Sequence, residues 1–273
     1  MNNFLNEIIK LKKKRLANAK AKISPEDLKR KALAVRENSN SHRLQTALKQ
    51  NDKINIIAEI KRASPSKGVI NDKINVGDLA RLYEKGGACA ISVLTEEDKF
   101  QGSLEDLKTA KSAVEIPVLC KDFIFDEFQI YEAAEAGADV ILLIAAILGD
   151  EVLSKLHRLA ERDLGLDALV EVHTLEELER IKKTSAKIIG INNRDLHSFK
   201  VSLDVSRRLI KHAPENALMI SESGLQMRDD LLELKDLGFS GFLIGETLMR
   251  SENISEKLRQ LATNKHERTQ NYS

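Results

Sequence analysis

Apolar residues recur along most of the chain in short runs, and stretches with helical spacing separate these runs. The runs are nearly continuous and most end in polar side chains, which is typical of buried strands in a parallel sheet. Eight of them begin near Ile56, Ala90, Val118, Val140, Ala168, Ile188, Leu218 and Gly241. The pattern therefore predicts eight strands that alternate with helices.

Capping signals mark the helices between these strands. Ser103 to Asp106 and Thr174 to Glu177 both fit capping boxes, and Asp126 can cap a helix that runs to Gly137. Gly137 and Gly238 stand where left-handed helix ends favour glycine. Eight strand–helix units with right-handed crossovers favour a closed (β/α)8 TIM barrel. An open doubly wound sheet is the alternative, but the G-x-G-x-x-G turn that a dinucleotide would require is absent from the sequence.

Charge is unevenly distributed, because residues 1–36 carry eleven Lys and Arg against three acids. Ser24-Pro25 opens a second helix of this segment as N-cap and first position. We expect a helical extension over 1–50 that packs on a barrel over 51–263, followed by a polar tail over 264–273. Binding to RNA and mitochondrial targeting are alternatives for this segment; a solvated lysine-rich face near a phosphate substrate explains the charge equally well. The apolar stripe of the first helix comprises Phe4, Leu5, Ile8, Ile9, Leu11 and Leu16.

Composition narrows the classes of protein. The 273 residues are 42% hydrophobic and carry a net charge of +1, which argues against a whole-molecule nucleic-acid or membrane binder. The longest apolar run, 140–148, is shorter than the ~20 residues that span a bilayer, and the N-terminus has no signal-peptide core. Cys89 and Cys120 are expected to be buried thiols in a reducing compartment. We therefore expect a cytoplasmic protein with no membrane or nucleic-acid partner.

Polar side chains follow seven of the eight predicted strands, and in a barrel these ends meet at one face. Strand alternation places Glu59 and Lys61 on the same side of the first strand. The strand that begins at Val140 ends only in alanines. The other candidates are Ser64, Phe100, Lys121, Phe123, Glu171, Asn192, Arg194, Glu222, Ser223, Gly224, Gly245 and Glu246. Gathering two lysines, an arginine and several carboxylates at one end of a barrel costs folding free energy. Such a cluster therefore indicates a functional site.

A phosphate ligand is the next inference. Ser223, Gly224 and Gly245 follow the seventh and eighth strands, where backbone N–H groups at helix N-termini bind phosphate in such barrels. Ser64 could close this site from the first loop. Simple tight turns would also explain these glycines.

Seven segments follow one another along the chain: AEIKRASPSKG from Ala58, SVLTEEDKFQGS from Ser92, PVLCKDFI from Pro117, LVEVH from Leu169, GINNRDL from Gly190, SESG from Ser221 and FLIGETLM from Phe242. Together, and in this order, they resemble the indole-3-glycerol phosphate synthase family. Lys99 would be a departure, because members usually carry an aromatic residue there. The resemblance implies a TIM barrel and the substrate 1-(2-carboxyphenylamino)-1-deoxyribulose 5-phosphate, converted to indole-3-glycerol phosphate, carbon dioxide and water.

This chemistry needs an acid for ring closure and an acid and a base later. Lys121 is the expected acid, with its pKa lowered by other cations and partial desolvation. Glu171 is the matching base, or it stabilises the positive charge that develops on the nitrogen. Lys61, oriented by Glu59, pairs with the substrate carboxylate and is a further candidate for the acid of the dehydration step. The other roles are positioning by Asn192 and Glu222, orientation of a carboxylate by Arg194, and apolar walls from Phe100 and Phe123.

Other functions stay open at this point. Another phosphosugar isomerase or aldolase of this fold would share the phosphate site but not the set of acids and lysines. His173 follows Glu171 by two residues, but no second histidine stands at a ligand spacing, and we expect a loop or helix-capping role for it. We expect no metal, no cofactor, a small phosphorylated substrate, and a monomer or weak homodimer.

Overall fold

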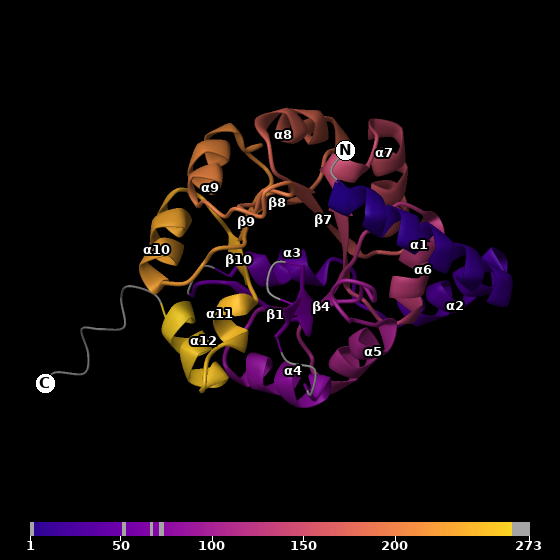
Figure 1. Ribbon diagram of the computed structural model, residues 1–273, viewed down its shortest axis with the longest axis horizontal. Coiled ribbons are helices and arrows are strands. Elements are labelled where there is room, and N and C mark those ends of the chain that lie inside the picture. The colour runs from indigo at the N-terminus through magenta and orange to yellow at the C-terminus, as the bar shows by residue number, and fades with distance from the viewer. Residues whose placement is uncertain (1–2, 51–52, 66–67, 71–73, 264–273) are drawn as a thin grey trace, which may run out of the picture.

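A computed structural model describes residues 3–50, 53–65, 68–70 and 74–263. Eight parallel strands close into a barrel in the order β1-β10-β9-β8-β7-β6-β5-β4, and β4 pairs with β1 (Figure 1). The closed barrel confirms the predicted fold and excludes the open sheet. Each strand begins within one residue of its predicted start: β1 Ile56–Ile60, β4 Ala90–Leu94, β5 Val118–Lys121, β6 Val140–Ile144, β7 Asp167–Val172, β8 Ile188–Asn192, β9 Leu218–Glu222 and β10 Gly241–Ile244.

Helices cover the outside of the barrel, and a short hairpin of β2 (Ala63–Ser64) and β3 (Gly68–Val69) follows β1. The predicted N-caps are confirmed: the side chains of Ser103, Asp126 and Thr174 each accept a backbone N–H of the following first turn. Gly137 and Gly238 both have positive φ. The helices are α4 Val76–Lys85, α5 Leu104–Ala113, α6 Glu127–Glu135, α7 Asp150–Arg158, α8 Leu175–Ile181, α9 Asp204–Leu209, α10 Arg228–Asp236, α11 Glu246–Met249 and α12 Ile254–Ala262.

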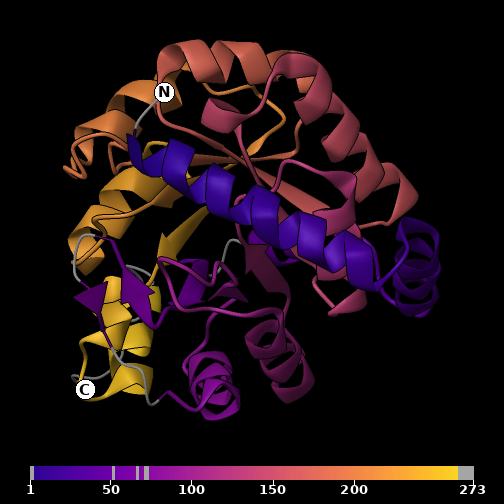
Figure 2. The ribbon, with the colours of Figure 1, turned by 45° about the vertical axis from the view of Figure 1, so that its right-hand side comes forward.

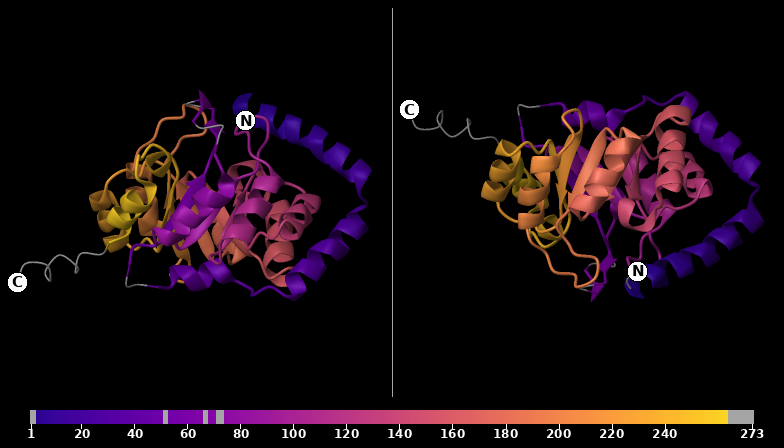
Figure 3. Two further views of the ribbon diagram at one scale, coloured as in Figure 1. Left: turned by 90° about the horizontal axis from the view of Figure 1, so that it is seen from below. Right: turned by 90° about the horizontal axis from the view of Figure 1, so that it is seen from above.

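Among the described residues before β1, three helices wrap around the barrel: α1 (Asn3–Lys22), α2 (Pro25–Glu37) and α3 (Arg43–Leu48). Helix α1 crosses the face at which the strands end, α2 runs along the side against α6, and α3 lies at the opposite end (Figures 2 and 3). This arrangement confirms the helical extension. The predicted tail over 264–273 lies outside the described residues.

Two apolar clusters form the core. One lies between the strands and the surrounding helices, and the other fills the barrel interior. Leu44 and Leu48 of α3 belong to the interior cluster, as do Leu5 and Ile8 of α1. Because side chains from α1 and α3 join the cluster that the strands enclose, the extension is part of the folded barrel.

The basic face of α1 is not solvated throughout, contrary to expectation. Lys12 Nζ lies 2.6 Å from Asp122 Oδ2, and the two side chains are only 12% and 10% exposed. Arg15 pairs with Glu97 and Asp98 in the loop after β4. These contacts fix α1 to the loops after β4 and β5, because acids of the barrel neutralise much of its charge.

Candidate active site

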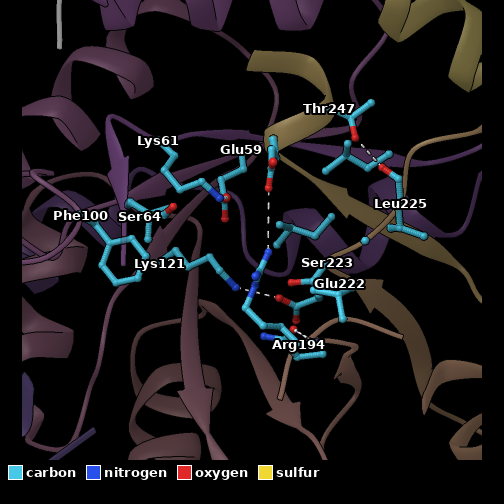
Figure 4. Close-up of a pocket in the computed structure, with 18 of the residues that line it drawn as sticks. Glu59, Lys61, Ser64, Phe100, Lys121, Arg194, Glu222, Ser223, Leu225 and Thr247 are labelled. Atoms are coloured by element: carbon cyan, nitrogen blue, oxygen red, sulfur yellow. Dashed lines mark hydrogen bonds and ion pairs between the residues drawn. The ribbon is translucent and has the colours of Figure 1, made fainter. Parts of the chain in front are cut away.

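A cavity of about 1040 Å³ opens at the C-terminal ends of the strands (Figure 4). Its polar residues come from neighbouring parallel strands: Asn192 pairs with Glu222, and Glu171 pairs with Gly190, two residues before Asn192. Every residue that the sequence placed in the site lines this cavity: Glu59, Lys61, Ser64, Phe100, Lys121, Phe123, Glu171, Asn192, Arg194, Glu222, Ser223, Gly224, Gly245 and Glu246.

Lys121 lies between two buried carboxylates. Its Nζ is 2.7 Å from Glu222 Oε2 and 3.3 Å from Glu171 Oε2 (Figure 4). Burial by itself lowers the pKa of Lys121, but the charges of Glu222, Glu171 and Glu59 outweigh burial and raise the pKa above its ordinary value. The expectation of a lowered pKa is therefore wrong, because carboxylates rather than cations surround this ammonium.

The two carboxyls beside Lys121 differ in acidity. Burial raises the pKa of Glu222 to about 7, and the nearby charge of Glu171 adds to this effect. Burial also favours the neutral form of Glu171, but Lys121 and His173 outweigh it and lower the pKa of Glu171. Of the two coupled carboxyls, Glu222 is therefore the one whose surroundings favour the protonated form, whereas those of Glu171 favour the ionised form.

Glu59 and Lys61 form a second ion pair at the cavity wall, with 2.7 Å between Lys61 Nζ and Glu59 Oε1 (Figure 4). Gly245 leaves the space that Glu59 occupies, because a Cβ at this position would lie 3.1 Å from the Cβ of Glu59 and closer still to its Oε1. The carboxylate of Glu59 can therefore orient Lys61 only if position 245 carries no side chain.

Apolar side chains line the rest of the cavity. The rings of Phe100 and Phe123 lie 6.3 Å apart between centroids, and Leu142 and Ile144 line the wall that belongs to β6. Sequence reasoning missed the contributions of α1 and of the loop after β8: Phe4 stacks edge-to-face on Phe199 at 5.2 Å, and both line the cavity with Leu196. The apolar stripe of α1 was visible in the sequence, but its packing partner was not.

Lys99 points away from this wall. Its Nζ lies 2.7 Å from Glu7 Oε1 of α1, and Lys99 is not among the residues that line the cavity. The lysine at this position therefore anchors α1, and Phe100 supplies the ring on the cavity side.

The loops after β9 and β10 lie on one side of the cavity. Ser223 and Gly224 both have positive φ, and the side chain of Val201 occupies the space next to Gly224. We expected Ser223 and Gly224 to lie at a helix N-terminus. This expectation is wrong, because helix α10 begins only at Arg228. Gly245 directly precedes the short helix α11.

Arg194 is held by its own loop. Its backbone N–H donates to Asn192 Oδ1, its Nη1 donates to the carbonyl of Phe199 at 3.2 Å, and its Nη2 lies 4.0 Å from Glu246 Oε2 (Figure 4). The guanidinium thus faces the side of the cavity that carries Gly245.

His173 lies directly behind Glu171. Its Nε2 is 3.3 Å from Glu171 Oε1, its Nδ1 is 3.5 Å from Glu177 Oε2, and its side chain is 9% exposed. His173 directly precedes Thr174, the N-cap of α8, so the prediction that it lies in a loop is confirmed. The sequence analysis did not predict its contact with Glu171. The E-x-H spacing is the signal that could have found it, because residues two apart in a strand share a face.

Comparisons with known proteins identify related sequences. The family model described as indole-3-glycerol phosphate synthase matches residues 5–261. The chain is 43% identical to the indole-3-glycerol phosphate synthase of Carboxydothermus hydrogenoformans, over 93% of this chain and 98% of the relative. Identity to the synthase of Legionella pneumophila strain Paris is 43%, over 96% and 100% of the two chains. For Desulfosudis oleivorans it is 49%, over 76% and 79%.

Solved structures with low sequence identity share the fold. Thiamine phosphate pyrophosphorylase from Pyrococcus furiosus aligns with a TM-score of 0.57 at 18% identity, covering 77% of this chain and 94% of that chain. The N-acetylmannosamine-6-phosphate 2-epimerase of Clostridium perfringens gives 0.58 at 17%, covering 77% and 92%. Within the described ranges, no helix is both long and apolar enough to cross a membrane.

Proposed function

Because the chain belongs to the indole-3-glycerol phosphate synthase family and has that carboxy-lyase activity, we propose that the cavity of Figure 4 is its active site. The observation that carries the proposal is the Lys121 ammonium between Glu171 and Glu222 in the same cavity as the Glu59–Lys61 pair. The family implies a phosphorylated substrate, 1-(2-carboxyphenylamino)-1-deoxyribulose 5-phosphate.

Ring closure requires the aryl carbon that bears the carboxylate to attack the ketone of the substrate. Lys121 donates a proton to the ketone oxygen as this bond forms, and Glu171 stabilises the positive charge that develops on the nitrogen. The ionised state of Glu171 and the protonated state of Lys121 suit these roles. Glu222 Oε1 is buried and has no hydrogen-bond partner among the described residues, so it can accept a hydrogen bond from a hydroxyl group of the substrate.

Decarboxylation and dehydration follow. Lys61 binds the carboxylate until the bond to carbon dioxide breaks and its electrons return to the ring. Lys61 can then protonate the departing hydroxyl, which leaves as water, while Glu171 takes a proton from the ring CH2 next to the nitrogen, so that the C–H electrons form the new double bond and the N–H is kept. Glu59 keeps the ammonium of Lys61 oriented, and Asn192 positions Glu171 through a side-chain hydrogen bond.

The remaining residues bind the two ends of the substrate. The aryl ring lies between Phe100 and Phe123, and the phosphate lies against Ser223, Gly224 and Gly245, where backbone N–H groups donate to it. Ser64, Arg194 and Glu246 border this site. We assign residues 51–263 to the catalytic barrel and 1–50 to its extension, and expect a cytoplasmic monomer or weak homodimer.

The test mixes purified protein with the carboxyphenylamino sugar phosphate and follows indole fluorescence, with carbon dioxide release as a second readout. We expect stoichiometric formation of both products. Folded protein that yields neither product would contradict the proposal. The dephosphorylated substrate should bind much more weakly, and equal affinity for both compounds would exclude the phosphate site.

A further inference from the structure

Behind the cavity, the turn between β7 and α8 holds three ionisable side chains in a row. Glu171 ends in the cavity, His173 lies behind it, and Glu177 lies behind His173. Their side chains are 4%, 9% and 15% exposed. His173 is not among the residues that line the cavity, so it reaches the substrate only through Glu171.

The backbone of the turn fixes this row. Glu177 Oε2 accepts the backbone N–H of His173 at 2.6 Å, and the backbone N–H of Glu177 donates to the hydroxyl of the N-cap Thr174. The carboxylate of Glu177 is thereby held beside the Nδ1 of the ring. Nδ1 lies 3.5 Å from Glu177 and Nε2 lies 3.3 Å from Glu171; among the described residues neither nitrogen has a hydrogen bond of good geometry, so these contacts are ion pairs when the ring is protonated.

The contacts of Glu171 divide between its two oxygens. Oε2 faces Lys121 and the reacting centre, whereas Oε1 faces His173. We propose that His173, supported by Glu177, is a positioning residue that holds the Oε1 of Glu171 from behind, so that Oε2 stays ionised and aimed at the substrate nitrogen. This inference rests on the proposed function of Glu171.

Carboxylates on α8, β7 and β9 favour an imidazolium at His173. Burial alone lowers its pKa, but Glu177 of α8 and Glu171 of β7 outweigh burial, Glu222 of β9 adds to them, and the pKa of His173 is raised. Lys121 of β5, a cation that also faces Glu171, is paired with both Glu171 and Glu222. A protonated ring therefore adds a second positive charge beside Glu171, which lowers the pKa of that carboxyl.

The first experiment compares turnover against pH for the wild type and His173→Gln. Loss of the imidazolium raises the pKa of the coupled Glu171–Glu222 pair, so the acid limb of kcat should move to higher pH. A shift of roughly one unit would reduce kcat about tenfold on that limb. KM should change much less, and the exposed His197→Gln should leave the profile unchanged. An acid limb that stays in place in an active, folded His173→Gln would overturn the proposal.

A double-variant cycle asks whether His173 acts through Glu171. In a Glu171→Gln background, His173→Gln should cost no further single-turnover rate, and an additional loss equal to that in the wild type would overturn the proposal. If His173→Gln does not fold, nitrogen-15 spectra of the histidine rings in Glu177→Gln provide the test: the ring of His173 should titrate at lower pH than in the wild type. An unchanged titration would reject the support by Glu177. Wild-type protein without indole formation would instead reject the proposed function.

Discussion

At the scale of single residues, the arrangement around Lys121 decides how the site can use a proton. A raised pKa keeps the ammonium charged across the physiological range, so a proton is always present to be donated. The carboxylate and phosphate of the substrate also favour the charged ammonium, so it is the basicity of the alkoxide that develops at the ketone oxygen that drives the transfer of the proton.

Replacing Lys121 with methionine keeps most of the volume and removes the acid. We expect single-turnover formation of cyclised species to fall by ~100-fold or more, while substrate affinity changes much less. Lys61→Met is the matched comparison, because it should weaken substrate binding and slow a step after ring closure. An analogue without the carboxylate should not distinguish Lys61→Met from the wild type. Normal ring closure in Lys121→Met would reject Lys121 as the acid.

The pKa of Glu222, raised to about 7 by burial, predicts a pH dependence. Below that pH the carboxyl keeps its proton and no longer attracts the ammonium of Lys121. Turnover should therefore rise with pH up to about 7, and this acid limb should be absent in Glu222→Gln. A limb of the same midpoint in Glu222→Gln would assign it to another group.

At the scale of elements, loops after different strands share the work of shaping the cavity. Gly245 at the end of β10 leaves room for Glu59 of β1, and Gly190 of β8 leaves room for the carboxylate of Glu222. Each glycine thus sets the position of an acid on a neighbouring strand, which a sequence motif does not reveal.

Gly245→Ala should affect more than phosphate binding. The added Cβ would contact Glu59 and displace the carboxylate that orients Lys61. We therefore expect kcat to fall and KM to rise together, in steady-state kinetics with the carboxyphenylamino substrate. Gly149→Ala, whose Cβ would meet nothing within 4 Å, is the control and should resemble the wild type. An effect of Gly245→Ala on KM alone would restrict its role to the phosphate.

Helix α1 is held over the cavity by ion pairs, of which the buried Lys12–Asp122 pair is the strongest candidate for a stabilising contact. Lys12→Met should lower the free energy of unfolding by roughly 3 kcal/mol, because it leaves the buried carboxyl of Asp122 without its cation. Denaturant unfolding measures this loss, and the exposed Lys13→Met is the control. In an Asp122→Asn background the same substitution should cost much less, and equal costs in both backgrounds would argue against direct coupling.

At the scale of the whole molecule, the sequence predicted what short-range patterns determine. Continuous apolar runs located all eight strands, and parallel pairing then placed Lys121, Glu171 and Glu222 at one end of the barrel. The sequence could not reveal contacts between distant segments. Lys12 and Asp122 are 110 residues apart, and the pKa of Lys121 depends on carboxylates from three other strands. The sign of that shift was therefore mispredicted although the residue was correctly placed.

The free energy of unfolding should depend on pH through Glu132 of α6, whose pKa is also set by residues distant in the sequence. Burial raises its pKa to about 7, and Asp122, Glu97 and Asp126 add to this while Lys12 opposes it. A carboxyl with a raised folded pKa holds its proton better in the folded state, so its stabilising effect is complete below its unfolded pKa and is lost as pH rises through about 7. Glu132→Gln should therefore raise the free energy of unfolding relative to the wild type at pH 8, and this gain should shrink toward zero near pH 4. The exposed Glu215→Gln should show no such trend, and a gain that is independent of pH would mean that ionisation of Glu132 is not its cause.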